Sequence, residues 1–201
     1  MVMNIPLQGS GVSSWRKSPA QGRSIQAEQK LARAARELLA EHAYDEIRVH
    51  EVARKAGISV GGFYGRFKGK TALLHLADID FLEECLQAFD RALPEDTTGP
   101  PEEIFRRFVS VMVEQFRTHR SAILQAMRFA GEGDATDFRE RASLFNEQVH
   151  GRLRRLLGAR HDDIHHPDPA TAVNLAIFFA SSAARDAVLR GSLAAYPITI
   201  D

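Results

Sequence analysis

The stretch from Arg48 to Leu74, RVHEVARKAGISVGGFYGRFKGKTALL, constrains the fold of this chain more than any other segment. Four apolar residues recur at i, i+3, i+4 and i+7 on one side of a short helix, namely Val49, Val52, Ala53 and Ala56. Gly57 is expected to end that helix, and the hydroxyl of Ser59 to cap the next one. Phe63 and Phe67, four residues apart, supply an inward face. The spacing therefore predicts two short helices joined by a sharp turn.

Two adjacent glycines, Gly61 and Gly62, stand at the start of the second short helix. Each costs a helix roughly 1 kcal/mol relative to alanine, and a close approach to another backbone is one reason to keep them. Two short helices and a sharp turn are the outline of a helix-turn-helix, which lays its second helix in a DNA groove. The alternative is a helical hairpin in a core whose basic residues only solvate its outer face.

The segment resembles the N-terminal domain of the TetR family of bacterial transcriptional regulators. The resemblance runs in register through Val52, Ala53, Ala56 to Ser59, Gly61, Phe63, Tyr64, Phe67, Lys70 and Leu73. It covers only the first third of the chain. It implies an all-α fold, in which an N-terminal three-helix domain with the helix-turn-helix is joined by a long fourth helix to a C-terminal bundle that binds an effector and dimerises.

The resemblance also implies roles for single residues. Ser59 to Gly62 would begin the groove-facing helix, Tyr64 would contact the DNA backbone, and Lys70 would contact a phosphate. The predicted DNA-binding residues are Arg48, Ser59, Val60, Gly61, Gly62, Tyr64, Arg66, Lys68 and Lys70. Specificity then depends on Val60 at a thymine methyl, on backbone contacts or on DNA shape, and these alternatives stay open.

Three positions depart from the family pattern. Arg48 stands where threonine is usual, Gly62 where threonine or serine is frequent, and Arg66 where histidine is common. The two arginines can still hold phosphates. Gly62 has no side chain with which to read a base.

The charge of the chain is divided between its two ends. Residues 15–70 contain 12 Lys and Arg against 6 Asp and Glu, whereas residues 71–201 contain 14 against 20, so the net charge of zero conceals a basic and an acidic part. A basic N-terminal part suits binding to phosphates. Palindromic double-stranded DNA is the predicted macromolecular partner, and solvation of a charged face is the alternative reading.

The expected domains are a disordered tail over residues 1–22, a helix-turn-helix domain over 23–70, and an effector-binding and dimerisation domain over 71–201. Residues 1–22 are rich in Gly, Ser, Pro and Gln and show little periodicity. Trp15, Arg16 and Lys17 interrupt that composition. They are read either as part of a mobile terminus or as an arm that enters the minor groove.

The last helix, which Asp168 is expected to cap, is apolar around most of its girth, so it must be covered on two sides. A second copy of the chain is the expected cover, and burial within one subunit is the alternative. The predicted homodimer interface comprises Phe145, Val149, Val173, Ile177, Ala180, Ser181, Ala184 and Val188. Two heads related by a two-fold axis would read two half-sites of a palindrome.

A small apolar or amphipathic effector that releases a repressor from DNA is implied by the resemblance. Its candidate pocket residues are Phe105, Phe108, Met112, Phe116, Met127, Phe145, Asn146, Asn174 and Phe178. An aromatic and methionine stripe at helical spacing is also what an ordinary core contains. A ligand-sequestering helical protein without a DNA response is the alternative function.

No catalytic constellation, cofactor or metal site is expected. The cluster of His161, Asp162, Asp163, His165 and His166 has no matching second cluster and reads as an exposed loop. The single cysteine, Cys85, lies on an apolar helix side and reads as a buried hydrophobe. With one cysteine and no long apolar run, the chain is predicted to be cytoplasmic, without a membrane segment.

Overall fold

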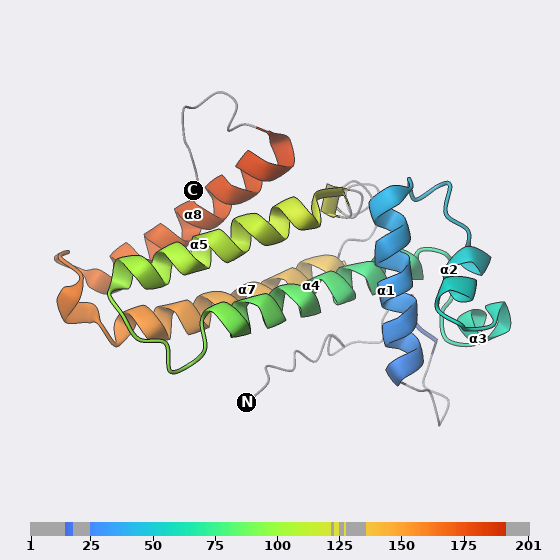
Figure 1. Cartoon of the computed structure of the whole chain (residues 1–201), viewed down its shortest axis with the longest axis horizontal. Helices are drawn as coiled ribbons and strands as arrows, with labels where there is room; N and C mark the ends of the chain where they lie inside the picture. Colours follow the sequence, from blue (N-terminus) through green and yellow to red (C-terminus); the bar gives the residue numbers. More distant parts are fainter. Residues whose placement is uncertain (1–14, 18–24, 122, 125–126, 128–135, 192–201) are drawn as a thin grey trace. The chain divides into compact units, whose positions relative to one another are not determined.

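The computed structural model describes residues 15–17, 25–121, 123–124, 127 and 136–191, except for the side chains of 188–190. Within these ranges the regular elements are helices, accompanied by one isolated β-bridge (Figure 1). The predicted all-α fold is confirmed. No helix in the described ranges is both long enough and apolar enough to cross a membrane.

The helices follow one another with short connections. They are α1 (Ile25–Glu41), α2 (Val49–Lys55), α3 (Val60–Tyr64), α4 (Ala72–Ala92), α5 (Pro101–Thr118), α7 (Thr136–Gly158), the 3-10 helix η1 (His161–Asp163) and α8 (Pro169–Arg190). Pro101 opens α5, where its fixed backbone angle suits the first turn. The carboxylate of Asp168 accepts the backbone N–H of Thr171 at 3.0 Å, which confirms the predicted cap of α8.

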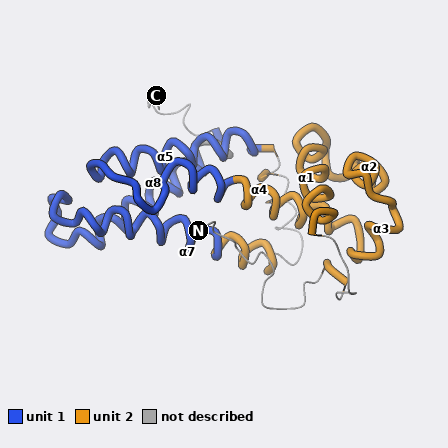
Figure 2. Tube along the Cα trace, turned by 60° about the horizontal axis from the view of Figure 1, so that its bottom comes forward, with its two compact units in different colours: residues 1–3, 85–120, 144–201 blue, residues 4–84, 121–143 orange. Residues whose placement is uncertain are grey.

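The chain divides into two compact units, which Figure 2 distinguishes by colour. Unit 1 comprises residues 1–3, 85–120 and 144–201, and unit 2 comprises residues 4–84 and 121–143. Both α4 and α7 contribute residues to each unit. The domain boundary at residue 70, which the sequence places after the helix-turn-helix motif, stays a prediction beside this division into compact units.

Unit 2 contains the two predicted short helices and their support. α1 packs on α2, and α2 on α3. The largest fully buried side chains of this unit are apolar and come from α1 to α4 and the turn after α3, namely Leu31, Val52, Phe63, Phe67, Leu73, Leu74 and Leu76. Arg36 of α1 bridges two carboxylates of α4, at 2.5 Å to Asp80 and 2.6 Å to Glu84, and so ties these helices together.

Unit 1 contains α5, α8 and the remaining parts of α4 and α7. α5 packs against α8, and the ring of Phe108 lies 5.6 Å from that of Phe89. Arg152 is buried with its guanidinium 2.6 Å from the carboxylate of Asp90. Cys85 is buried, as the sequence predicts, and its sulfur lies 3.7 Å from Oε1 of Gln115.

Candidate nucleic-acid interface and ligand cavity

The turn between α2 and α3 has the geometry that the residue pattern predicts. Gly57 adopts a φ of 68°, a left-handed conformation that side chains rarely tolerate. The N–H of Ile58 then donates to the carbonyl of Ala53 at 2.8 Å, which closes the end of α2. Ser59 accepts the N–H of Gly62 at 3.0 Å and caps α3.

α3 presents one buried and one exposed side. Phe63 is fully buried, and its ring centroid lies 5.1 Å from that of Phe67. Val60 and Tyr64 are 41% and 43% exposed, although both carry large apolar surfaces. The exposed Val60 at the N-terminus of α3 suits contact with base edges and thymine methyls in a groove.

The two adjacent glycines have different surroundings. A Cβ at Gly62 would lie 3.1 Å from both Cγ2 of Ile58 and Oγ of Ser59. A Cβ at Gly61 would meet nothing within 4 Å. Internal packing therefore accounts for the missing side chain at Gly62, whereas Gly61 has room for one. The smallness of Gly61 is left unexplained by the chain's own packing.

The predicted basic contacts fall into two groups. Arg48 and Lys68 are exposed, and the backbone N–H of Arg48 donates to Glu51 at 2.7 Å. Arg66 and Lys70 are half-buried and already engaged. Arg66 donates to the carbonyl of Gly62 at 2.7 Å, and the Lys70 ammonium donates to the carbonyl of Asp45 at 3.1 Å.

Lys70 also lies 4.4 Å above the centre of the Tyr44 ring, a cation–π contact that helps to place its charge. Burial raises the pKa of Tyr44, so the phenol stays neutral beneath the ammonium group. Lys70 and Arg66 therefore stiffen the end of the motif, in addition to any contact with phosphate.

The segment Trp15–Lys17 corrects the prediction of a disordered tail over residues 1–22. Arg16 forms an antiparallel bridge with Phe67, the N–H of Lys68 donates to the carbonyl of Trp15, and the N–H of Lys17 donates to that of Arg66. Trp15 is only 4% exposed. Residues 1–14 and 18–22 lie outside the described residues. The average composition of residues 1–22 is polar, and it did not reveal that the single buried side chain of Trp15 is enough to hold this segment in place.

Lys17 is a candidate DNA contact that the sequence reading left open. Its ammonium group donates to the carbonyl of Tyr64 at 2.5 Å, at the end of α3. Its side chain is exposed, and so is that of the nearby Lys68. The only signal in the sequence was the pair of basic residues that follows Trp15.

Of the residues predicted to bind an effector, Met127 lines the cavity of unit 2 described below, and the role of the others stays a prediction. Phe108 and Met112 are buried, whereas Asn146, Asn174 and Phe178 are exposed. Half-buried positions are taken by Phe105, Phe116 and Phe145. The stripe on α5 thus serves as core, which is the ordinary use of such a pattern.

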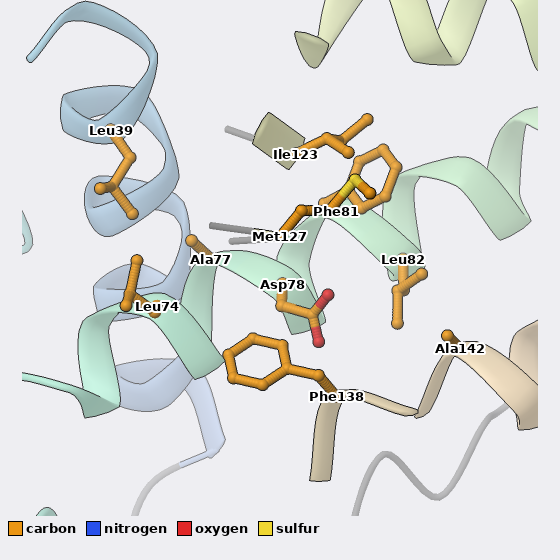
Figure 3. A pocket seen from close by; sticks show the side chains of 10 residues that line it. All are labelled: Leu39, Leu74, Ala77, Asp78, Phe81, Leu82, Ile123, Met127, Phe138 and Ala142. Carbon is orange, nitrogen blue, oxygen red and sulfur yellow. The ribbon is translucent and has the colours of Figure 1, made fainter. Parts of the chain in front are cut away.

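The cavity of unit 2 contains one of the predicted residues, Met127 (Figure 3). Its volume is about 200 Å³. It is lined by Leu39 of α1, by Leu74, Ala77, Asp78, Phe81 and Leu82 of α4, by Ile123 and Met127, and by Phe138 and Ala142 of α7. Nine of these ten residues were not predicted, because the wall is assembled from four separate stretches of chain.

The residues predicted for the dimer interface differ in their exposure, and the interface itself stays a prediction. Val149, Val173, Ile177 and Ala184 are buried within one chain, so their side chains are not available to a partner. The side chains of Phe145, Ala180 and Ser181 are half-buried, and that of Val188 lies outside the described residues. The other apolar side of α8 is exposed instead: Leu175 by 50%, and Phe178 and Phe179 by 63% each. The period of the helix indicated two stripes but not which one faced inward.

The histidine-rich loop makes local contacts. His165 and His166 each place Nδ1 near a backbone carbonyl, at 3.1 Å from Asp163 and 2.8 Å from Asp168. In the part of the chain that the structure describes, no three His, Cys, Asp or Glu side chains gather as a metal site would require.

Comparison with known proteins gives a family match to the N-terminal region. Residues 31–77 match the family described as bacterial regulatory proteins, tetR family. An HTH-type transcriptional regulator of Bacillus subtilis (strain 168), YerO, is 29% identical over 97 residues. That alignment covers 48% of this chain but only 33% of YerO.

Solved structures extend the likeness of the fold beyond that region. The fatty acid degradation regulator FadR of Bacillus halodurans has a TM-score of 0.58 at 17% identity, covering 85% of this chain and 88% of its own. FadR of Bacillus subtilis, solved in complex with stearoyl-CoA, has a TM-score of 0.58 at 18% identity, covering 81% and 87%. A tetR-family regulatory protein from Rhodococcus RHA1 has a TM-score of 0.54 at 20% identity, covering 81% and 85%.

Proposed function

We propose that this chain, which belongs to the TetR family of bacterial transcriptional regulators, binds double-stranded DNA through α3 and regulates transcription rather than catalysing a reaction. The turn, its caps and the buried Phe63 and Phe67 hold α3 firmly. Its exposed side offers Val60 and Tyr64 to a groove. We place the protein in the cytoplasm, where its DNA would be.

Gly61 is the observation that carries this proposal. It is exposed, it lies in a helix that it weakens, and a Cβ there would meet nothing in its own chain. Packing within the chain therefore does not require glycine here. We infer that a molecule outside the chain occupies the space that a side chain would take. The backbone and base edges of a DNA groove fit that description, because they approach a helix N-terminus closely.

Selection of bound duplexes from a random pool tests this proposal. The wild-type chain should recover a defined sequence, and Gly61→Ala should bind that duplex at least about tenfold more weakly while unfolding at the same or a higher temperature. Gly158→Ala is the matched control, since a Cβ there also meets nothing within 4 Å and Gly158 is the last residue of α7, outside the α2–α3 turn. Recovery of no preferred sequence would overturn the proposal.

Arg48, Lys68 and Lys17 supply exposed positive charge around α3 and are proposed as phosphate contacts. Lys17→Ala should weaken binding to all duplexes alike and reduce the salt slope by about one. Lys30→Ala is the matched control, because this exposed lysine lies on α1. If the two variants had equal slopes, Lys17 would not be a DNA contact.

The DNA-bound form is proposed to be a homodimer on a palindromic operator. The exposed Leu175, Phe178 and Phe179 of α8 form an apolar surface of the kind that protein partners cover. Two copies joined there by a two-fold axis would carry two heads to half-sites about 34 to 36 Å apart. Phe178→Asp should give a monomer in sedimentation at micromolar concentration, whereas Asn174→Asp, on the same helix, should not. A dimeric Phe178→Asp would refute this interface.

A small molecule that releases the protein from DNA completes the proposal, so the chain acts as a repressor. The solved complex of Bacillus subtilis FadR with stearoyl-CoA supports this in a protein of similar fold. The cavity of unit 2 supports it in this chain. A protein that sequesters an apolar ligand without responding to DNA is the other candidate, and the duplex selection separates the two.

A further inference from the structure

The cavity of unit 2 has the size and lining of a site for a compact apolar molecule. Its volume of about 200 Å³ exceeds the roughly 150 Å³ of an engineered protein cavity that takes up benzene. Phe81, Leu82 and Phe138 are among the apolar groups that surround it. A molecule of one ring with a short substituent fits this space, whereas the volume is small for a long acyl chain.

Among the described residues that line the cavity, Asp78 is the one ionisable group. Figure 3 shows its carboxylate among the apolar side chains. Arg141 of α7 donates from Nε to Oδ2 of Asp78 at 2.7 Å, and no described residue bonds Oδ1. Burial raises the pKa of Asp78, with the Arg141 guanidinium opposing that effect. The carboxylate of Asp78 can accept a hydrogen bond from a donor group on the ligand. It would repel a ligand that carries a carboxylate of its own.

A column of stacked rings leads from the wall of the cavity to the DNA-facing turn. The ring of Phe138 stacks on that of His75 with centroids 4.3 Å apart, and His75 stacks on Trp15 at 4.8 Å and an interplanar angle of 6°. Nδ1 of His75 also lies 3.1 Å from Nη2 of Arg141, the partner of Asp78. Both the apolar and the polar side of the cavity therefore contact His75.

Trp15 is the end of this column and part of the DNA-facing region at once. Its ring stacks on Phe67 at 5.6 Å, and its carbonyl accepts the N–H of Lys68. The next residues, Arg16 and Lys17, pair with Phe67 and Arg66. A shift of Phe138 that displaces His75 would therefore act on the segment that holds Lys17 beside α3.

We propose that the unit 2 cavity binds a compact, largely apolar molecule bearing one neutral hydrogen-bond donor, and that its occupancy alters DNA binding through Phe138, His75 and Trp15. The binding part stands on the cavity alone. The regulatory part rests on the proposed function. Close-packed rings have little free space between them, so a displacement of one ring moves the next. Mutation of rings in the column measures this coupling.

Titration of the full-length chain with benzyl alcohol, toluene and benzoate tests the binding part by calorimetry. Benzyl alcohol should bind best, toluene should bind several-fold more weakly, and benzoate should not bind. Ala142→Phe, at the exposed wall of the cavity, should lower the affinity for benzyl alcohol at least about tenfold. Ser143→Phe, one exposed position further along α7, should keep that affinity within about twofold of the wild type. Equal affinities in these two variants, or benzoate binding as well as benzyl alcohol, would overturn the site.

The fluorescence of Trp15, the only tryptophan in the sequence, reports on the coupling. Benzyl alcohol should change its emission and lower affinity for the selected duplex several-fold in the wild type. Both changes should be lost in Phe138→Leu and kept in Phe145→Leu, since Phe145 lies on the same helix but its ring makes an edge contact with Phe89, outside the column. Binding without either change would overturn the coupling but not the site. A chain that binds benzyl alcohol yet selects no duplex would instead refute the proposed function.

Discussion

The α2–α3 turn and the unit 2 cavity differ in how far apart along the chain their residues lie. The turn is built from residues 48–70, and its two decisive contacts, Ile58 to Ala53 and Gly62 to Ser59, span five and three residues. The cavity takes its wall from α1, α4, Ile123, Met127 and α7, so residues as distant in the chain as Leu39 and Ala142 line one cavity. Local hydrogen bonds shape the first site, and long-range packing shapes the second.

This difference predicts where single changes have large effects. A cap contributes about 1 kcal/mol, because its loss only exposes a backbone donor to water. A buried ion pair that spans two helices costs several times more to break, because the remaining charge stays buried. The expected loss of stability on changing Trp15 lies between these two values, because Trp15 belongs to a segment distant in the chain that supports the local turn.

The largest effect is expected at the cavity. Arg141→Ala removes a side chain that is 4% exposed and leaves the Asp78 carboxylate, 16% exposed, without its partner. The free energy of unfolding should fall by about 3 to 5 kcal/mol in urea titrations. Arg139→Ala, an exposed neighbour on α7, should stay within about 0.5 kcal/mol. A similar loss in both variants would mean that the ion pair does not support the cavity.

Trp15→Ala should have the next largest effect. It deletes a buried ring that stacks on both Phe67 and His75, so we expect a loss of about 3 kcal/mol in thermal or urea unfolding. Trp15→Phe keeps a ring in place and should cost less than about 1.5 kcal/mol. If Trp15→Ala unfolded like the wild type, the turn would not need support from Trp15. The contrast between a locally built turn and a cavity built by long-range packing would then be stronger.

The cap of α3 should show the modest cost of a local contact. Ser59→Ala removes the acceptor of the Gly62 N–H, and the free energy of unfolding should fall by about 1 kcal/mol. Ser110→Ala, on the exposed side of α5, is the control and should be neutral. A loss above about 3 kcal/mol would show that the turn depends on tertiary packing as strongly as the cavity does.

The smallest effect is a pH dependence in unit 1, outside both sites. Burial lowers the pKa of His150, and the nearby Arg154 charge lowers it further. The unfolded chain therefore takes up a proton at a higher pH than the folded chain. The stabilising contribution of neutral His150 is complete above the unfolded pKa near 6.5 and is lost as the pH falls through the lower, folded pKa.

Urea titrations at several pH values between about 5 and 8 measure this dependence. The wild type should lose stability toward the acid end, and His150→Gln should lose less. His161→Gln is the control, because this exposed side chain lies in η1. An identical pH profile in wild type and His150→Gln would rule out the contribution of His150.

Sequence reasoning predicted the turn correctly because its determinants are neighbours in the chain. Apolar spacing marks the helices, Gly57 marks the left-handed stop, and Ser59 marks the cap. The same reasoning identified only Met127 of the residues that line the unit 2 cavity, and it did not show which apolar stripe of α8 is buried within the chain. A helix with two apolar stripes carries no local signal for which stripe faces its own core.

The amino-acid sequence alone determined the all-α fold and the geometry of the α2–α3 turn, since helical period, caps and glycine stops act within a few residues. Only the tertiary structure decided that Trp15 packs on Phe67 and His75, that Gly62 is crowded while Gly61 is open, and that Asp78 lines a cavity. Each of these depends on which distant side chains fill the space around a residue. That space is created by packing between helices, and no local pattern of residues encodes it.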